Sequence, residues 1–512
     1  MSKSFYITTP IFYPNDRLHL GNAYPMIIAD IIARYKRSKG YQVYFQTGSD
    51  EHGEKIEKKA ILLGLTPQQL VDKNVSLFQR LWKELGISEH FFYRTSSPKH
   101  KEKVQKIFTE LLKKGDIYLG EYQGKYCIAC EDYVSDSKVS DNNLCPTPNC
   151  QSELRKINEP AYFLRVSKYY SALVKHYSQN PDFLLPFNIK KELFENFLKN
   201  DIRDLCVTRS DITWGISVPN NEKMVIYVWF EALLNYLNSE EGEKAFISPN
   251  AEIIHLIGKE ITRFHAIYWP IILFSLNKRL PNKILAHGWL TTPQGKMSKS
   301  KGRVIDPLEI LKNYPFDLLR SYFVAKINFL QDGVCDEVML KDFYHDFLVN
   351  NLSNLVSRVN KMLQLYQEGI IPPLEKDLKN KKLEEYKKKC EFVVKEFQEK
   401  MNNCELTNAF FKIQTLLDET NKLISDLAPW ELAKKGDIAL LNYTLNYLSN
   451  GIKIVTYLLN CIIPETSKKI FKIFNIDSEK INYSNLSDFS ALNGVKVKLL
   501  ERHLYQPIEK IN

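Results

Sequence analysis

The sequence has 512 residues, 44% of them hydrophobic, and 70 Lys plus Arg against 60 Asp plus Glu give a net charge of +10. That length and apolar content can bury several cores, so we expect two to four domains. The sequence has no run of about 18 uncharged apolar residues and no basic-then-apolar start, which argues against a membrane-spanning helix and a secretion signal. We expect a cytoplasmic protein whose modest positive charge permits a polyanionic partner without demonstrating one.

Residues 5–22, FYITTPIFYPNDRLHLGN, combine an apolar β-prone run, a proline-broken loop and a helix start at His19. Apolar residues at four-residue spacing predict a helix over residues 23–39 that ends before Gly40. Backbone N–H groups and the helix dipole favour an anion at His19, and Gly21 lets a ligand approach the backbone. Alone, this pattern also fits a solvated histidine at a helix cap.

A second predicted strand, residues 41–47, leads into a loop that carries Asp50 and His52. Ligands of parallel sheets gather at the carboxyl ends of strands, so this loop is predicted to lie close to His19. Two scaffold helices are predicted next, residues 66–85 behind a capping box and residues 99–114.

The pattern changes between residues 116 and 220, where short β-prone pieces surround a cysteine cluster. Cys127 and Cys130 form one close pair, and Cys145 and Cys150 form another. Two such pairs can place four sulfurs around a tetrahedral Zn²⁺, a closed structural site without an open position for catalysis. The alternative is idle thiols, and nine cysteines in total fit reduced thiols better than disulfides.

Residues 225–229 are predicted to form a strand that resumes the α/β pattern, followed by a helix. Trp229, Ala232 and Tyr236 share one face of that helix. From periodicity alone, this stripe fits core packing better than a binding site.

A turn-rich loop over residues 292–303 contains the string KMSKS at residues 296–300. Two ammonium groups and two hydroxyls on a glycine-flanked loop suit closure over a phosphate chain. The alternative is an exposed basic loop, which needs no such order of residues.

The remaining sequence is predicted to be helical, with residues 308–348 as a connection and residues 349–512 as a bundle. Asn354 and Arg358 lie four residues apart and therefore project from one helix face, while Trp430 provides a flat ring. Such a trio can read unpaired bases by stacking and edge hydrogen bonds, although Trp430 alone would be read as core.

His19-Leu20-Gly21-Asn22 and KMSKS together resemble the two signatures of class I aminoacyl-tRNA synthetases, which flank a Rossmann-type ATP site. Asn22 departs from the histidine usual at that position. The strings YVWFEALLNY at 227–236, GKEI at 258–261 and PIFY at 10–13 are similar to methionyl-tRNA synthetase segments.

The resemblance implies an α/β fold: a Rossmann-type parallel-sheet catalytic domain, split by a zinc-knuckle insertion and followed by an all-α helical-bundle anticodon-binding domain. The expected divisions are residues 1–115 and 221–295 for the catalytic halves, 116–220 for the insertion, 296–348 for the KMSKS loop and stem-contact region, and 349–512 for the bundle.

The resemblance also implies the reaction, in which L-methionine and ATP with Mg²⁺ give methionyl-adenylate and methionine is then transferred to methionine tRNA. The implied catalytic residues are His19, Asn22, Lys296 and Lys299, and Gly21, Met297, Ser298 and Ser300 join them in ATP binding. The implied methionine site comprises Pro10, Ile11, Tyr13, Asp50, Trp229, Ala232, Tyr236, Ile261 and His265, with His52 and Arg209 as further active-site candidates. Asn354, Arg358 and Trp430 are implied to read the anticodon, and Cys127, Cys130, Cys145 and Cys150 to bind one structural zinc ion.

Two other functions stay open. A nucleotidyltransferase acting on a small metabolite would share the signatures, but the large helical C-terminus speaks against it. A non-catalytic tRNA-binding paralogue is kept open by Asn22, whereas the intact His19, Asp50 and KMSKS speak against it. We expect a monomer.

Overall fold

The computed structural model describes residues 3–127, 129, 132–134, 142–147, 150–199, 202–210, 212–293, 295–296, 305–374 and 378–508. The chain divides into two compact units. The first comprises Met1–Ala29 and Gln42–Gly288, and the second comprises Asp30–Tyr41 and Trp289–Asn512. Among the described residues, we find no helix with the length and apolar character needed to cross a membrane.

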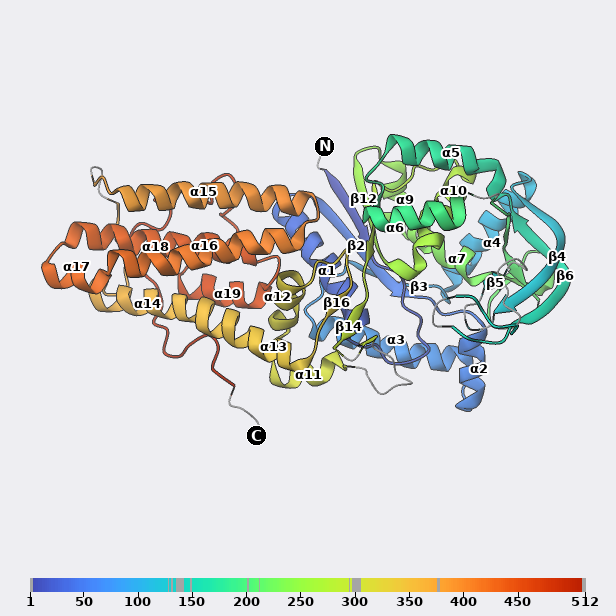
Figure 1. Cartoon of the computed structure of the whole chain (residues 1–512), viewed down its shortest axis with the longest axis horizontal. Coiled ribbons are helices and arrows are strands. Elements are labelled where there is room, and N and C mark those ends of the chain that lie inside the picture. Colours follow the sequence, from blue (N-terminus) through green and yellow to red (C-terminus); the bar gives the residue numbers. More distant parts are fainter. Residues whose placement is uncertain are drawn as a thin grey trace. The chain divides into compact units, whose positions relative to one another are not determined.

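A six-stranded sheet forms the centre of the first unit, and its strands β2, β3 and β12 are labelled in Figure 1. The strand order is β3-β2-β1-β12-β13-β7, and every neighbouring pair is parallel. The strand order reverses between β1 and β12, and open α/β sheets bind their ligands at such a switch point. The expected Rossmann-type sheet is therefore confirmed. Its strands are β1 Ser4–Thr8, β2 Gln42–Ser49, β3 Phe91–Arg94, β7 Leu184–Leu185, β12 Ala251–Gly258 and β13 Lys283–His287.

Helices connect these strands, and their caps follow the sequence signals. The predicted capping box is present at the start of α3, where the Thr66 hydroxyl accepts the Gln69 backbone N–H at 3.2 Å and Gln69 Oε1 accepts the Thr66 N–H at 2.9 Å. The helices are α1 Leu20–Ser38, of which residues 20–29 belong to this unit, α2 Glu54–Leu62, α3 Pro67–Glu84, α4 Pro98–Lys113, α5 Val166–Gln179, α6 Phe187–Leu193, α7 Val228–Leu233, α8 Asn235–Asn238, α9 Glu240–Ile247 and α10 Trp269–Ser275.

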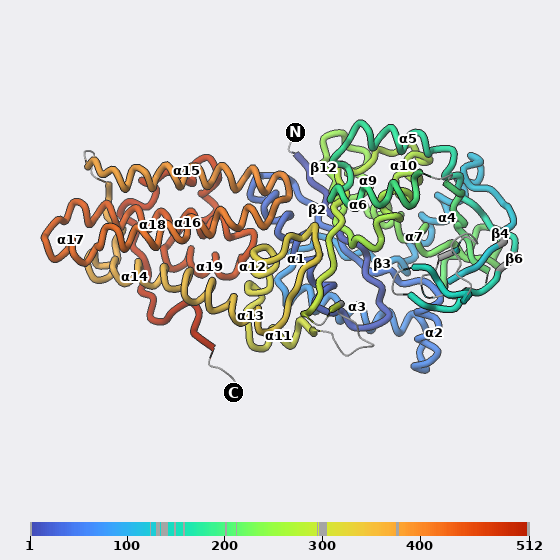
Figure 2. The backbone as a smooth tube through the Cα atoms, in the orientation of Figure 1, coloured from blue at the N-terminus to red at the C-terminus, as the bar shows by residue number. Residues whose placement is uncertain are grey.

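The region between α4 and α7 contains two small sheets, and β4 and β6 run side by side as a long antiparallel pair (Figure 2). Their pairing begins at Ile117 with Leu164 and continues to Tyr126 with Arg155. The strands are β4 Ile117–Cys127, β5 Asp132–Val134, β6 Arg155–Leu164 and β8 Leu205–Cys206 in one sheet, and β9 Thr208–Arg209, β10 Ile216–Val218 and β11 Asn221–Ile226 in the other.

The strand predicted at residues 225–229 is wrong in extent and in its sheet. β11 ends at Ile226 and pairs antiparallel with β9 and β10, and helix α7 begins at Val228. A short apolar run that is buried in either conformation does not distinguish a strand from a helix, so the pattern could not locate this change. The next strand of the parallel sheet along the chain is β12, after β7 has already joined the sheet beside β13.

The second unit contains a small sheet, β15-β14-β16, and a bundle in which α15, α16 and α18 pack against one another (Figure 1). The predicted helical C-terminal region is confirmed. Its elements are β14 Leu290–Thr292, β15 Gly295–Lys296, β16 Gly333–Val334, α11 Pro307–Asn313, α12 Phe316–Lys326, α13 Glu337–Phe343, a π-helical segment Tyr344–Ser353, α14 Asn354–Gln367, α15 Lys381–Asn402, α16 Leu406–Leu427, α17 Pro429–Lys435, α18 Ile438–Leu459 and α19 Pro464–Ile473.

Candidate active site

The start of α1, after β1, is held by reciprocal contacts between His19 and the residues that follow it. The His19 backbone N–H donates to Asn22 Oδ1 at 3.0 Å, and the Gly21 N–H donates to His19 Nδ1 at 3.1 Å. Because Nδ1 accepts, the neutral imidazole carries its proton on Nε2. A Cβ added at Gly21 would lie 2.9 Å from His19 Cε1, so glycine is required for this folded-back imidazole.

The loops that follow β1 and β2 are hydrogen-bonded to each other. The Phe12 N–H donates to the Gly48 carbonyl at 2.8 Å, and the Asp50 N–H donates to the Phe12 carbonyl at 2.9 Å. The Asp50 residue is 9% exposed at this edge of the sheet. The predicted methionine-site residues Pro10, Ile11 and Tyr13 lie in the same segment as Phe12, which makes this pairing.

Tyr236 and His265 form a buried hydrogen-bonded pair. His265 Nδ1 donates to the Ile261 carbonyl at 3.1 Å, so Nε2 accepts the Tyr236 O–H at 2.8 Å. Burial lowers the pKa of His265 to about 4, which keeps the imidazole neutral at physiological pH. Burial raises the pKa of Tyr236, and the Asp50 carboxylate adds to that effect. The structure thus joins three predicted residues, Tyr236, Ile261 and His265, from two segments of the chain.

A layer of buried polar residues beneath Tyr236 was missed by the sequence analysis. The Trp269 indole N–H donates to His255 Nε2 at 3.1 Å, so His255 Nδ1 donates to the Thr8 hydroxyl at 2.7 Å. The His255 ring lies 4.5 Å from the Tyr236 ring, and burial holds the pKa of His255 well below its ordinary value. In the sequence, this layer is marked only by isolated polar residues inside apolar strands. The further members of this layer are Tyr6, Gln46 and Asn235.

Trp229 extends the aromatic surface beside His265. Its ring stacks on Phe264 with centroids 3.9 Å apart and an interplanar angle of 6°, and the His265 ring lies edge-on at 6.3 Å. Trp229 is partly exposed, whereas Ala232 is buried in the same helix. The two predicted residues therefore continue the surface formed by Tyr236 and His265, and Phe264 is an addition to the predicted set.

The two further candidates, His52 and Arg209, line one small cavity together with Trp214. Arg209 is 4% exposed, its guanidinium lies 3.8 Å from the Tyr227 ring centroid, and Nη1 donates to the Thr208 carbonyl at 2.8 Å. A stacked guanidinium in this environment keeps its charge and provides several donors in a fixed plane.

Three of the four predicted zinc ligands converge. The Sγ atoms of Cys127, Cys145 and Cys150 lie within 4.8 Å of one another, and those of Cys127 and Cys150 are 3.5 Å apart. This separation is too long for a disulfide and close to the ~3.8 Å edge expected for a tetrahedron with 2.3 Å Zn–S bonds. The thiols present therefore fit a zinc ion, and Cys130 lies outside the described residues.

Most of the KMSKS string lies outside the part of the chain that the structure describes. Gly295–Lys296 forms β15, which pairs with β14, while Met297, Ser298, Lys299 and Ser300 are not among the described residues.

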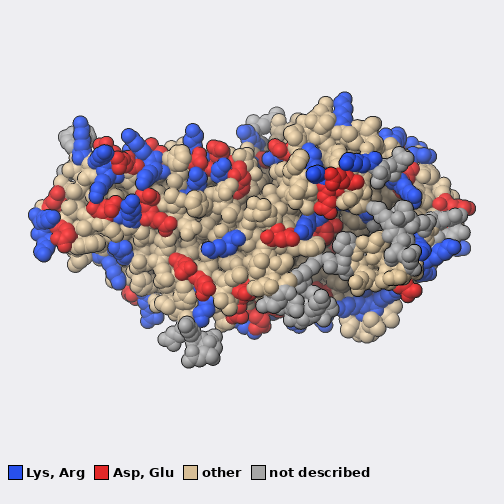
Figure 3. Space-filling view, in the orientation of Figure 1, with Lys and Arg blue, Asp and Glu red and all other residues tan. Residues whose placement is uncertain are grey.

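The predicted RNA-reading residues lie on helices of the second unit. Asn354 and Arg358 are partly exposed in α14, and Trp430 is 44% exposed in α17, so Trp430 is not a core residue. Lys434 lies one turn further along α17 and is exposed. On the face shown in Figure 3, basic and acidic side chains are interspersed over this unit, so no single-sign field dominates there.

Comparisons with known proteins bear on the family. The sequence model described as tRNA synthetases class I (M) matches residues 5–360. The chain belongs to the methionyl-tRNA synthetase family. A methionine–tRNA ligase of Ureaplasma parvum is 41% identical over 512 residues, covering 97% of this chain and 96% of the relative. One from Halalkalibacterium halodurans is 40% identical over 517 residues, covering 96% of this chain and 76% of the relative.

Solved methionyl-tRNA synthetase structures share the fold. The Mycobacterium tuberculosis enzyme in complex with methionyl-adenylate matches with a TM-score of 0.91 at 29% identity, covering 98% of this chain and 99% of that one. Its apo form matches with a TM-score of 0.86 at 28% identity, covering 99% of each chain. The resemblance to methionyl-tRNA synthetases inferred from the signature strings is confirmed.

Proposed function

We propose that the protein is a methionine–tRNA ligase, which activates L-methionine with ATP and Mg²⁺ and transfers methionine to the 3′ end of methionine tRNA. The observation that carries this proposal is the neutral, buried Tyr236–His265 pair, which packs against His255 of β12 at the sheet's switch point, in a chain of the methionyl-tRNA synthetase family.

Methionine recognition follows from the chemistry of this pocket. The thioether is flexible, polarizable and weakly accepting, which suits the aromatic surface of Trp229, Tyr236 and Phe264. A neutral His265 leaves no buried cation beside the apolar side chain. Asp50 provides the negative charge for the substrate ammonium group, and this pairing selects an α-amino acid.

Adenylation requires the methionine carboxylate to attack the α-phosphorus of ATP in line and release pyrophosphate. Negative charge develops on the phosphate oxygens, where His19 Nε2–H, the Asn22 amide and the N-terminus of α1 are donors suited to stabilise it. Lys296 and Lys299 add positive charge in this proposal. No covalent enzyme intermediate is needed, so positioning and electrostatics supply the rate.

tRNA recognition is assigned to the second unit. Partial exposure of Trp430, with Lys434 one turn away, suits stacking on an unpaired base beside a phosphate, and Asn354 and Arg358 offer edge hydrogen bonds. Zinc held by Cys127, Cys130, Cys145 and Cys150 stabilises the insertion. We further propose a cytoplasmic monomer.

Amino-acid-dependent ATP–pyrophosphate exchange across the twenty amino acids tests the proposal. Of the twenty amino acids, only methionine is expected to support exchange. In the full reaction, methionine tRNA is expected to become aminoacylated. Exchange without aminoacylation would favour a metabolite nucleotidyltransferase, and tRNA binding without exchange would favour a non-catalytic paralogue.

A further inference from the structure

The first unit contains a buried carboxylate to which the proposed reaction assigns no role. Glu231 in α7 is 0% exposed and lies between two buried histidines. Its Oε1 is 2.8 Å from Nδ1 of His52, in the loop after β2, and its Oε2 is 2.7 Å from Nε2 of His100, in the first turn of α4. Three segments distant in sequence are thus joined by one side chain.

The proton positions in this chain follow from the partners. The Glu231 carboxylate accepts both N–H groups, so His52 donates from Nδ1 and His100 donates from Nε2. His100 Nδ1 must then accept, and the Tyr93 O–H donates to it at 3.0 Å while Asn238 Nδ2 lies 3.4 Å away. Burial by itself raises the pKa of Glu231, but the two imidazoles more than offset that effect and keep the carboxylate ionised.

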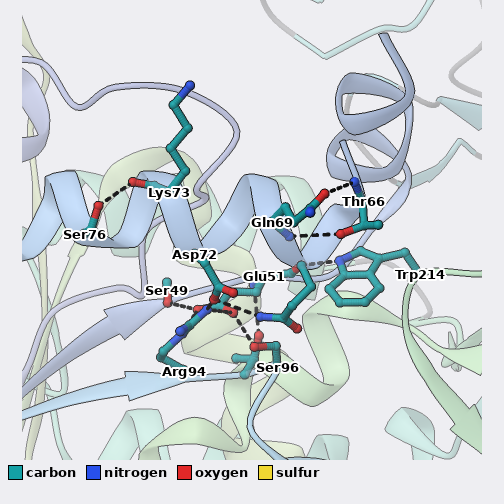
Figure 4. A network of polar contacts seen from close by, with 12 residues as sticks. Ser49, Glu51, Thr66, Gln69, Asp72, Lys73, Ser76, Arg94, Ser96 and Trp214 are labelled. Atoms are coloured by element: carbon teal, nitrogen blue, oxygen red, sulfur yellow. Dashed lines mark hydrogen bonds and ion pairs between the residues drawn. The ribbon is translucent and has the colours of Figure 1, made fainter. Parts of the chain in front are cut away.

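Glu51, which follows Asp50 in the chain, is anchored independently of Glu231 (Figure 4). Glu51 accepts Arg94 Nε at 2.7 Å and Arg94 Nη2 at 2.9 Å, and it also accepts the Ser49 and Ser96 hydroxyls. These partners come from β2, β3 and the segment just after β3. Glu51 therefore holds the Asp50 loop to these two strands. His52 holds the same loop to α7 instead.

Helix α7 carries pocket residues on a different face from Glu231. Residues 229 and 231 are about 200° apart around a helix, so Glu231 points away from the surface formed by Trp229. Glu231 therefore acts on the pocket through the helix and loop that it joins.

We propose that Glu231 is a positioning residue that fixes Asp50 relative to Trp229 and Ala232, so that the ammonium group and the thioether of one amino acid are bound together. This inference rests on the proposed function, because it assigns Asp50 to the ammonium group of methionine. Loss of the carboxylate frees the loop from α7 and misplaces Asp50, while the apolar wall remains.

Glu231→Gln tests the proposal, since it keeps the side-chain volume and removes the charge. The readout is binding of methionine compared with 4-(methylthio)butanoic acid, which lacks only the ammonium group, measured by titration calorimetry. The wild type is expected to prefer methionine at least about tenfold, and Glu231→Gln to prefer it less than about threefold, because only the ammonium contact is weakened. In pyrophosphate exchange, the KM for methionine rises and the KM for ATP stays within about twofold.

Asp116→Asn is the matched control, because Asp116 is also 0% exposed and is hydrogen-bonded by Lys168 and Tyr169 in the same unit. It is expected to lower thermal stability without changing the preference for methionine. Equal losses of affinity for both ligands in Glu231→Gln, or the same change of preference in Asp116→Asn, would overturn the proposal.

A milder variant covers the case in which Glu231→Gln does not fold. Tyr93→Phe removes the hydroxyl that fixes the His100 tautomer and is expected to reduce the preference for methionine in the same direction, by about two- to threefold. An unchanged preference for methionine in folded Tyr93→Phe would then contradict the positioning role of Glu231. Absence of methionine-dependent exchange in the wild type would instead refute the proposed function.

Discussion

Asn22 Oδ1 accepts the backbone N–H of His19 at 3.0 Å, so the side chain that departs from the family's usual histidine also caps the helix that presents His19. Its amide nitrogen remains the end that can donate to a phosphate. An imidazole at this position could accept the same N–H through Nδ1 and donate through Nε2. We therefore expect either side chain to support function at this helix start.

The first prediction concerns this pair. Asn22→His is expected to be tolerated, Asn22→Ala to slow adenylation by up to about tenfold, and His19→Ala to slow it by about 100-fold, because a neutral hydrogen bond contributes less than the main donor. Pre-steady-state adenylate formation measures all three rates. A thousandfold gain in Asn22→His would mean that the natural asparagine disables the site.

Gly21→Ala should act through His19. The new Cβ would meet His19 Cε1 at 2.9 Å and displace the imidazole, so we expect adenylation to slow about as much as in His19→Ala. The double variant Gly21→Ala/His19→Ala should then be no slower than His19→Ala alone, because both changes remove one contribution. Additive losses in the same single-turnover assay would show that Gly21 acts separately.

Stability should fall on acidification below neutral pH. The pKa of His265 is about 4 in the folded protein against 6.5 as its ordinary value, so the unfolded state binds more protons between these limits. The contribution of His265 to the free energy of unfolding is fully present above about pH 6.5. It is lost as the pH falls towards 4, which lowers the free energy of unfolding by about 3 kcal/mol. Calorimetric melting temperatures at pH 7, 6 and 5 should decline less steeply in His265→Gln. Burial also lowers the pKa of His255, so the melting temperature of His265→Gln should still decline as the pH falls.

Zinc binding should depend on the cysteine cluster. We expect one zinc ion per chain by elemental analysis, and Cys145→Ser should weaken its retention because the Cys145 Sγ atom lies within 4.8 Å of two other cysteine Sγ atoms. Chelation should lower the melting temperature of the wild type. It should leave the melting temperature of Cys145→Ser unchanged once that variant has lost its zinc. A wild type without zinc, whose cluster thiols react freely in the native state, would refute the metal site.

Trp430→Ala should separate the two half-reactions. Loss of base stacking is expected to weaken tRNA aminoacylation by roughly 1–3 kcal/mol, while methionine-dependent pyrophosphate exchange without tRNA stays nearly intact. Lys434→Ala is a neighbouring control that should weaken tRNA binding mainly at low salt. Equal losses in exchange and aminoacylation would assign Trp430 a structural role.

Local signals predicted the scaffold well. The capping box at Thr66 and Gln69 and the first β–α–β unit depend on short-range patterns, and the structure has them within a few residues of their expected positions. The strand expected at residues 225–229 was wrong because apolar composition alone did not specify a conformation.

The buried polar contacts could not be paired from the sequence. A lone glutamate inside VWFEALLNY marks Glu231 as unusual, yet nothing in the string indicates that its partners are His52 and His100, which are 179 and 131 residues away. The cysteine cluster was easier to predict, because Cys127 and Cys150 lie close in the sequence as well as in space.

The antiparallel pairing of β4 with β6 has a consequence for the evolution of the chain. Ile117 and Leu164 face each other in that pair, so the chain enters and leaves the β4–β6 ribbon at neighbouring points. Loop-closure entropy grows only slowly with length, so segments can be gained or lost beyond Tyr126 and Arg155 with little effect on the catalytic sheet. The cysteine cluster thereby lies where changes of length and spacing cost the parallel sheet least.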